Sequence, residues 1–120
     1  MIKVLSVDDS RVIRELVESV LKNAGYAVTS AEDGLAALEL ARKEKFDLVL
    51  ADINMPRMDG IGMVSRLRKI DGYEFIPMIM ITTESGEDKK LKAKNLGATG
   101  WMTKPFTPER LLAAVKKLVG

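Results

Sequence analysis

The chain has 120 residues, of which 47% are apolar and 30% are charged, and its formal net charge is +2. These values are typical of one globular domain, residues 1–120, and they exclude a disordered or fibrous chain. The charge is too small to indicate nucleic-acid binding, and the absence of cysteine and histidine excludes disulfides, thiolate or imidazole metal sites and histidine-based catalysis.

The N-terminal residues run directly into an apolar segment that begins at Val4, so we expect no signal peptide. No apolar run approaches the ~18 residues that a membrane-spanning helix needs. A chain without cysteine also fits a reducing compartment. We therefore expect a cytoplasmic protein that does not bind a membrane.

Short strand patterns alternate with helical patterns five times along the chain. We predict strands at residues 4–7, 27–30, 48–51, 78–81 and 101–103. Continuous apolar runs, rather than alternating ones, indicate strands that are buried on both faces, as in a parallel sheet. Five strand–helix units with right-handed crossovers predict a doubly wound five-stranded α/β fold.

Four of the helical segments have clear boundaries and an apolar face. The first follows Ser10 as its N-cap and ends before Gly25, and the second runs from near Asp33 to about residue 45. The third begins at Asp59 and the fifth at Thr107. The apolar positions that we expect these helices to bury are Val12, Ile13, Leu16, Val17, Val20, Leu21, Ala24, Leu35, Leu38, Ala41, Ile61, Val64, Leu67, Ile70, Leu111, Leu112, Val115, Leu118 and Val119.

The fourth helix is poorly anchored. Ser85 and Asp88 have the spacing of a capping box, but Leu91 and Leu96 are the only large apolar residues from 87 to 96. Four lysines occupy much of the remaining surface: Lys89, Lys90, Lys92 and Lys94. Two interpretations remain open, a solvated lysine face and a movable face that binds a partner.

Polar side chains follow four of the predicted strands at the point where each strand ends. Asp8 and Asp9 follow the first strand and Asp52 the third, while Thr82 follows the fourth and Lys104 the fifth. Parallel strands bring these ends to one edge of the sheet, where doubly wound folds bind their ligands. The residue types predict a site for a divalent cation and a phosphoryl group.

The three carboxylates at this edge require a counter-charge. Two carboxylates within ~4 Å repel by roughly 4 kcal/mol at an effective dielectric constant near 20. Because the chain offers only oxygen ligands, a hard ion such as Mg²⁺ fits the cluster best. The alternative for Asp8 and Asp9 is an acidic turn between a strand and a helix, without a ligand.

Asp52 is best interpreted as a nucleophile. An ionised carboxylate needs no general base to attack phosphorus, and the product is an acyl phosphate. Lys104 supplies a positive charge on a long side chain, and the Thr82 hydroxyl is placed to bond a phosphoryl oxygen. A threonine that merely favours a strand and a plain loop proline at Pro105 are the alternatives at those positions.

Together these residues resemble the receiver domains of two-component response regulators. The resemblance covers the whole chain, and its motifs are Val-Asp-Asp-Ser at residues 7–10, Asp-Ile-Asn-Met-Pro-Arg-Met-Asp-Gly at 52–60, the threonine pair at 82–83 and Lys-Pro-Phe at 104–106. It implies a flavodoxin-like sheet with the strand order 2-1-3-4-5.

The resemblance also implies a role for each site residue. Asp52 corresponds to the phosphoacceptor, which takes its phosphoryl group from a histidine kinase. Asp9, Asp52 and the backbone carbonyl of Asn54 correspond to direct Mg²⁺ ligands, with Asp8 acting through water. Lys104 corresponds to the phosphoryl-binding lysine. Thr82 corresponds to the family's switch threonine, which moves toward the phosphoryl group. Trp101 corresponds to the aromatic residue that changes rotamer when this threonine moves.

Two positions depart from the family pattern. The position of Trp101 is more often tyrosine or phenylalanine, and indole is larger. Thr83 is often a smaller residue, and with Glu84 it borders the access to the phosphorylated aspartate. We expect the bulk of Thr83 to lengthen the lifetime of the phosphorylated state.

Within the family, Asn54, Glu84 and the segment Gly-Ala-Thr-Gly-Trp most resemble CheY-like chemotaxis regulators. This likeness implies a CheA-like histidine kinase as donor and an output protein such as the flagellar motor switch protein FliM. Because the chain ends at Gly120, we expect no output domain and no direct contact with nucleic acid. The output surface would then be the fourth helix, the fifth strand and the fifth helix.

Several alternatives remain open. The first alternative is a phosphorelay intermediate or the receiver of a longer transcriptional regulator. An aspartate-nucleophile phosphatase fits poorly, because such enzymes need a second acid two residues after the nucleophile and Ser10 stands there after Asp8. A flavin-binding protein fits less well, since an acidic edge repels the flavin phosphate. We expect a signalling protein that promotes its own phosphorylation and dephosphorylation, not an enzyme with multiple turnovers.

Overall fold

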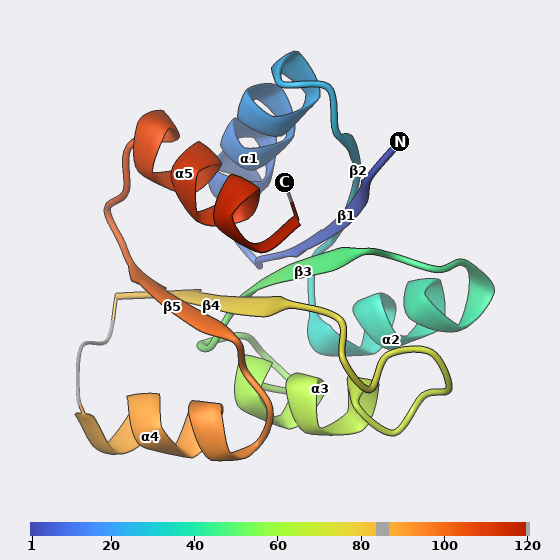
Figure 1. Ribbon diagram of the computed structural model, residues 1–120. Helices are drawn as coiled ribbons and strands as arrows, with labels where there is room; N and C mark the ends of the chain where they lie inside the picture. Colours follow the sequence, from blue (N-terminus) through green and yellow to red (C-terminus); the bar gives the residue numbers. More distant parts are fainter. Residues whose placement is uncertain (84–86, 120) are drawn as a thin grey trace.

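The computed structural model describes residues 1–83 and 87–119. Strands and helices alternate along the whole described chain (Figure 1). The strands are β1 (Lys3–Val7), β2 (Ala27–Ala31), β3 (Leu48–Asp52), β4 (Met78–Thr82) and β5 (Gly100–Thr103). The helices are α1 (Arg11–Asn23), α2 (Gly34–Lys43), α3 (Gly60–Leu67), α4 (Glu87–Asn95) and α5 (Pro108–Val119).

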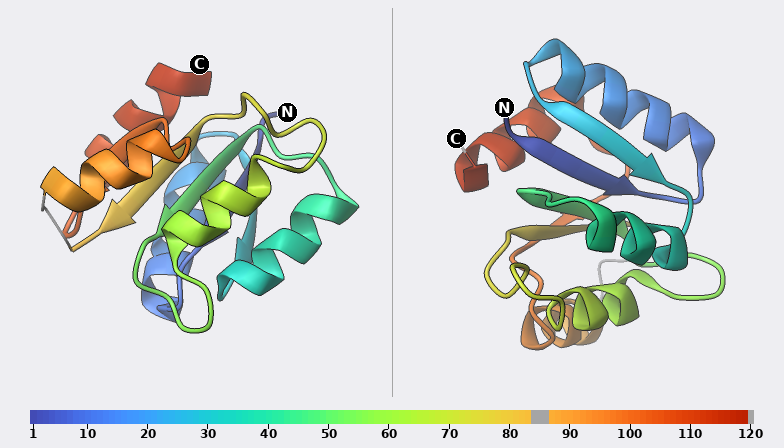
Figure 2. Two further views of the ribbon diagram at one scale, coloured as in Figure 1. Left: turned by 90° about the horizontal axis from the view of Figure 1, so that it is seen from below. Right: turned by 90° about the vertical axis from the view of Figure 1, so that its right-hand side faces the viewer.

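The five strands form one parallel sheet in the order β2-β1-β3-β4-β5, which confirms the predicted fold and strand order. Helices α1 and α5 cover one face of the sheet, and α2, α3 and α4 cover the other (Figures 1 and 2). The strand order reverses between β1 and β3, so the carboxyl ends of these two strands border the crevice where such folds bind ligands.

Alternate residues of the inner strands pack into two separate cores. Leu5 and Val49 face the α2–α3 side, whereas Val4 and Leu48 face the α1–α5 side, and all four side chains are fully buried. This explains why the strand sequences are continuously apolar, because neither face of the sheet is exposed to water.

The first two helices begin where the sequence predicts, but two of their apolar residues are exposed. Ser10 and Asp33 cap α1 and α2 by accepting hydrogen bonds from backbone N–H groups three residues later. Val12 is 73% exposed and Leu35 is 44% exposed, and Ala24, just past the end of α1, is also exposed, so the prediction that these three residues are buried is wrong. At about 100° per residue, Val12 and Leu35 lie well off the stripe that faces the sheet, whereas Ala24 is the C-cap beyond the last residue of α1.

Helix α4 is held weakly, as its sequence predicts. Among the side chains of α4 that the structure describes, Ala93 is the buried one, whereas Leu91 is 58% exposed. The C-terminal end of α4 is tied by Arg68, whose guanidinium donates hydrogen bonds to the backbone carbonyls of Gly97, Tyr73 and Ile76. The predicted cap residue Ser85 lies outside the described residues.

None of the helices in the described part of the chain is both long enough and apolar enough to cross a lipid bilayer.

Candidate functional site

The ends of β1 and β3 bring three acidic residues together. Asp8 directly follows β1, Asp52 is the last residue of β3, and the two strands are paired neighbours. One carboxylate oxygen from each of Asp8, Asp9 and Asp52 can be chosen so that all three lie within 4.8 Å of one another. Asp8 and Asp52 are buried and Asp9 is exposed, so the cluster opens to solvent on the side of Asp9.

Backbone turns after each strand fix the two buried carboxylates. Asp8 Oδ1 accepts a hydrogen bond of 2.8 Å from the backbone N–H of Ser10, at the start of α1. The Arg14 guanidinium reaches back from α1 and donates to the backbone carbonyl of Asp8 at 2.7 Å. Asp52 Oδ1 accepts from the backbone N–H of Asn54 at 3.2 Å. The two N–H groups orient the carboxylates, and Arg14 fixes the backbone of Asp8 at the edge of the sheet.

Lys104 reaches this cluster from the end of β5, across the intervening strand β4. Its Nζ lies 2.8 Å from Asp8 Oδ2 and 3.2 Å from Asp52 Oδ2, and the side chain is 15% exposed. Burial acts to lower the pKa of Lys104, but the hydrogen bonds and charges of Asp8 and Asp52 outweigh burial and raise it. The ammonium group is therefore charged and shared by two acids. The peptide bond from Lys104 to Pro105 is cis.

The carboxyl of Asp52 has a raised pKa. Burial is the largest cause, the charge of Lys104 opposes it, and the charge of Asp8 adds to the increase. The backbone N–H of Asn54 acts to lower the pKa. An acid in this position has a more basic oxygen than an exposed aspartate, which favours bond formation to an electrophile.

The donor set of the cluster fits a hard divalent cation. The three carboxylates supply only oxygen atoms, and the spacing of their oxygens is within the span of one small ion's coordination shell. Lys104 supplies a single positive charge to three acids, so a negative excess remains. This acidic cluster could therefore hold a metal ion, with Asp8, Asp9 and Asp52 as ligand candidates.

The other predicted site residues lie around this edge. Thr82 is fully buried at the end of β4 and accepts a backbone hydrogen bond of 2.7 Å from the N–H of Lys104. Thr83 is exposed. Trp101 is partly buried, pairs in register with Met80, and packs against the core on the α4 side. Glu84 lies outside the described residues.

Gly60 is a site residue whose importance the sequence analysis did not recognise. Its N–H donates to the backbone carbonyl of Ile53 at 2.8 Å. A Cβ atom at this position would lie 2.2 Å from the backbone oxygen of Asp52 and 2.6 Å from Met80 Cε. Helix α3 can therefore approach the end of β3 only through a glycine. The Asp-Gly pair at residues 59–60 indicates the start of a helix, but it does not by itself reveal this close approach.

Arg57 forms a second contact that the sequence did not reveal. Its guanidinium pairs with the buried carboxylate of Asp33, the cap of α2. Arg57 has a φ of 67°, in the left-handed region that non-glycine residues rarely adopt. The ion pair ties the loop after β3 to α2.

Comparisons with known proteins agree with this geometry. The family model described as "Response regulator receiver domain" matches residues 4–116. The chain is 36% identical to the chemotaxis protein CheY-3 of Vibrio cholerae over 97% of this chain and 90% of that protein. It is 38% identical to the probable transcriptional regulator ycf29 of Porphyra purpurea over 94% of this chain but 54% of that protein. The chain thus spans about half the length of that regulator.

The same fold occurs in solved structures. The crystal structure of the chemotaxis response regulator CheY4 of Vibrio cholerae superposes with a TM-score of 0.95, with 47% sequence identity and 98% coverage of both chains.

Proposed function

The chain belongs to the response regulator receiver domain family, and from this premise we propose that Asp52 accepts a phosphoryl group from a histidine kinase. Receiver domains are signalling switches of two-component systems that interact with histidine kinases and output partners. The observation that carries the proposal is the meeting of Asp8, Asp9, Asp52 and Lys104 at one edge of the sheet.

The transfer exchanges one bond to phosphorus for another. An oxygen of the Asp52 carboxylate attacks the phosphorus of a phosphohistidine, the P–N bond breaks, and an acyl phosphate forms as the histidine ring takes up a proton. Lys104 lies beside the Asp52 carboxylate and stabilises negative charge on the transferred group.

We propose that phosphorylation of Asp52 requires Mg²⁺ bound by the acidic residues. We assign Asp9, Asp52 and the backbone carbonyl of Asn54 as direct Mg²⁺ ligands and Asp8 as a ligand through water. Bound Mg²⁺ would supply the positive charge that lets an anionic phosphoryl group approach three carboxylates. The exposed position of Asp9 is consistent with a shallow site that keeps some of the ion's water.

Phosphorylation would be transmitted through Thr82 and Trp101. Thr82 ends the strand between those of Asp52 and Lys104, so its hydroxyl is one strand away from each. We assign Thr82 as the residue that bonds the phosphoryl group and Trp101 as the aromatic residue that responds. Trp101 adjoins the weakly held α4, so its movement would change the surface formed by α4, β5 and α5.

We further propose a chemotaxis role in the cytoplasm, with a CheA-like kinase and FliM as partners. The support is the sequence identity of 36% to CheY-3 and 47% to CheY4. The alternatives are a phosphorelay intermediate and the receiver of a longer transcriptional regulator, which the match to ycf29 favours. Binding of purified FliM with and without beryllofluoride tests the choice, and a lack of binding in both conditions favours an alternative.

The central proposal is tested by intact-mass measurement after incubation with acetyl phosphate and Mg²⁺. The wild-type protein should gain the mass of one phosphoryl group, and Asp52→Ala should not. Asp71→Ala, which changes an exposed acid in the loop after α3, is the matched control and should gain the same mass as wild type. An equal gain in Asp52→Ala would show that another residue is phosphorylated.

A further inference from the structure

The loop between β3 and α3, residues 53–59, carries one of the proposed metal ligands. It begins directly after Asp52, and its second residue is Asn54, whose backbone carbonyl we assign to Mg²⁺. Hydrogen bonds fix the base of the loop, because the Asn54 N–H donates to Asp52 Oδ1 and the Gly60 N–H donates to the carbonyl of Ile53. The position of the Asn54 carbonyl therefore depends on what holds the rest of this loop.

Two consecutive residues of the loop contact the start of α2. The Arg57 guanidinium pairs with the carboxylate of Asp33, the N-cap of α2. Met58 lies against Gly34, the first residue of α2, so closely that an added Cβ atom at Gly34 would be 3.0 Å from Met58 Sδ. The outer part of the loop is therefore docked on α2 through an ion pair and a packing contact.

The backbone of Arg57 has a conformation that arginine does not favour. Its φ of 67° lies in the left-handed region, which costs free energy for most residues and is tolerated best by glycine, asparagine and aspartate. Such residues persist where surrounding contacts hold them, and they concentrate at functional sites. The contact that holds Arg57 is its ion pair with Asp33.

Asp33 is a strong anchor for this pair because its carboxylate is buried. The side chain of Asp33 is 3% exposed, whereas that of Arg57 is 62% exposed. One carboxylate oxygen accepts a hydrogen bond of 2.9 Å from the backbone N–H of Ala36, and the other pairs with Arg57. Among the described residues, Arg57 alone pairs with this carboxylate. Because a buried charge without a partner is costly, Asp33 favours the loop conformation that brings Arg57 to it.

We propose that Arg57 is a positioning residue for the metal site. Its pair with Asp33 holds the loop 53–59 in the conformation that presents the Asn54 carbonyl to Mg²⁺. This inference rests on the proposed function, because it concerns the metal ion assigned there. Arg57 acts through the backbone of the loop and is itself no ligand of the ion.

The charges of the two side chains, taken alone, predict a different result. The positive charge of Arg57 repels a divalent cation, so its removal would strengthen Mg²⁺ binding, whereas removal of the negative charge of Asp33 would weaken it. Loss of the pair, in contrast, weakens Mg²⁺ binding whichever partner is removed. The direction of the change in affinity therefore separates positioning from charge.

The variants Arg57→Asn and Asp33→Asn test this difference by isothermal titration calorimetry with MgCl₂ at constant ionic strength. Asparagine tolerates the left-handed region at position 57 and is a good N-cap at position 33, so each variant removes the pair and keeps the local backbone. We expect both to bind Mg²⁺ at least threefold more weakly than wild type. The double variant has the net charge of wild type and should show the same loss as either single variant, because the pair can be lost only once.

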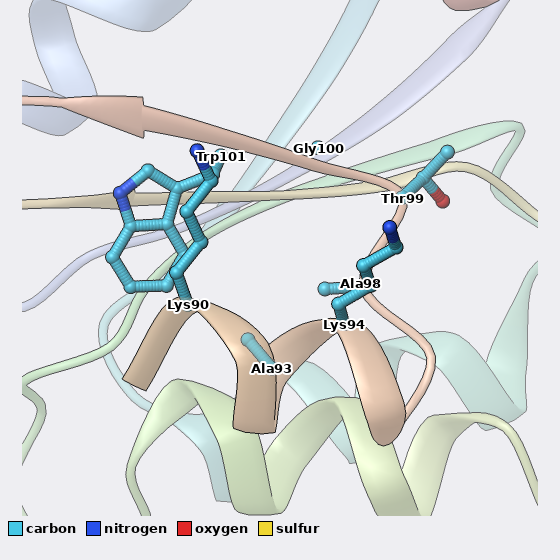
Figure 3. Close-up of a pocket in the computed structure, with 7 residues that line it drawn as sticks. All are labelled: Lys90, Ala93, Lys94, Ala98, Thr99, Gly100 and Trp101. Carbon is cyan, nitrogen blue, oxygen red and sulfur yellow. The ribbon is translucent and has the colours of Figure 1, made fainter. Parts of the chain in front are cut away.

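Two control variants separate the pair from charge and from global stability. Lys90→Asn removes a cation that lines the hollow between α4 and β5 (Figure 3) and should bind Mg²⁺ as wild type does. Tyr73→Phe removes a hydroxyl that bonds the backbone of Ala41, Glu44 and Phe46, so it should lower the stability and leave Mg²⁺ affinity unchanged. A weaker Mg²⁺ affinity in Tyr73→Phe would show that affinity follows global stability, and it would overturn the inference.

The rate of phosphorylation by acetyl phosphate gives a second readout. At limiting Mg²⁺, Arg57→Asn should gain mass at least threefold more slowly than wild type. Saturating Mg²⁺ should restore the wild-type rate, because Asp52 and Lys104 are unchanged. A rate that stays low at saturating Mg²⁺ would show that Arg57 acts on the transfer itself, which would overturn the positioning role.

The outcomes for the two proposals are distinguishable. If wild type binds Mg²⁺ and is phosphorylated on Asp52, unchanged Mg²⁺ affinity in both variants rejects the inference alone. Stronger binding by Arg57→Asn together with weaker binding by Asp33→Asn also rejects it, because charge then explains the effects. Absence of Mg²⁺ binding and of phosphorylation in wild type rejects the proposed function and this inference with it.

Discussion

Lys104 lies closer to Asp8 than to Asp52, with distances of 2.8 Å and 3.2 Å from its Nζ to the carboxylate oxygens. The ammonium group therefore neutralises a proposed metal-site acid as well as the proposed phosphoacceptor. When a phosphoryl group is added to Asp52, a stronger anion competes for the same ammonium group. Lys104 thus links the charge of the acidic cluster to the state of Asp52.

Replacing Lys104 by methionine should destabilise the metal-free protein. The change leaves Asp8 and Asp52 without their nearest cation, and loss of hydrogen bonds to charged groups of this kind costs about 1–3 kcal/mol. Urea unfolding in EDTA measures the difference in free energy of unfolding. Lys116→Met, on the exposed surface of α5, is the control and should be nearly neutral. Equal stability of Lys104→Met and wild type would contradict the shared ion pair.

Magnesium should raise the stability of the wild-type protein. A ligand that binds only the folded state at ten times its Kd stabilises by about 1.4 kcal/mol. Thermal unfolding with increasing MgCl₂, at constant ionic strength, should show this gain. Asp9→Asn should abolish most of it, and Asp71→Asn should not. An identical gain in Asp9→Asn would exclude Asp9 as a ligand.

The raised pKa of Asp52 predicts how stability depends on pH. The folded-state pKa lies above the unfolded value because of burial, so ionisation costs free energy in the folded protein. The contribution of Asp52 is therefore most favourable below the unfolded pKa of about 4 and is lost as pH rises through the folded pKa. In EDTA, Asp52→Asn should be more stable than wild type at pH 7, and its advantage should shrink toward pH 4.

Urea unfolding of Asp52→Asn and wild type at several pH values measures this difference. Asp71→Asn, which changes an exposed acid in the loop after α3, is the control. A lower stability of Asp52→Asn at pH 7 would show that Lys104 outweighs burial at this site.

Gly60→Ala should both destabilise the protein and impair phosphorylation. The new methyl group would displace the backbone of Asp52, and overpacking of a buried contact costs about 1–3 kcal/mol. Gly62→Ala in the same helix is the matched control, since its nearest neighbour would be the side chain of Asp59 at 3.3 Å. Urea unfolding and intact mass after acetyl phosphate treatment measure the two effects. Similar results for both variants would reject the role of Gly60.

Thr83→Ala should shorten the lifetime of the phosphorylated protein. Thr83 follows Thr82 at the exposed edge of the site, where a smaller side chain would give water easier access to the acyl phosphate. Decay of phosphorylated protein by intact mass gives the rate, with an expected increase of about twofold to fivefold, or roughly 0.4–1 kcal/mol in the barrier. Thr99→Ala, which changes an exposed threonine just before the start of β5, serves as control. An unchanged rate in Thr83→Ala would reject the access hypothesis.

The sequence by itself determined the type and order of the elements and the chemistry at their ends. The signals that made this possible are local: continuous apolar strands, helix caps such as Ser10, and acids after β1 and β3. Local signals can be recognised in the sequence without knowledge of the fold. They predicted which residues meet at one edge of the sheet. The strand order came from the family resemblance, not from the residues themselves.

The tertiary structure alone decided how these residues contact one another. The spacing of residues in the sequence does not reveal three of these contacts. The Nζ of Lys104 lies closer to Asp8 than to Asp52, Gly60 lies against the backbone of Asp52, and Arg68 binds the carbonyl of Gly97 after α4. Each contact joins residues from different elements, and its geometry depends on how several side chains pack at once. Val12 is exposed for a related reason: a helix buries only the positions that neighbouring elements cover, and none of the described elements covers Val12.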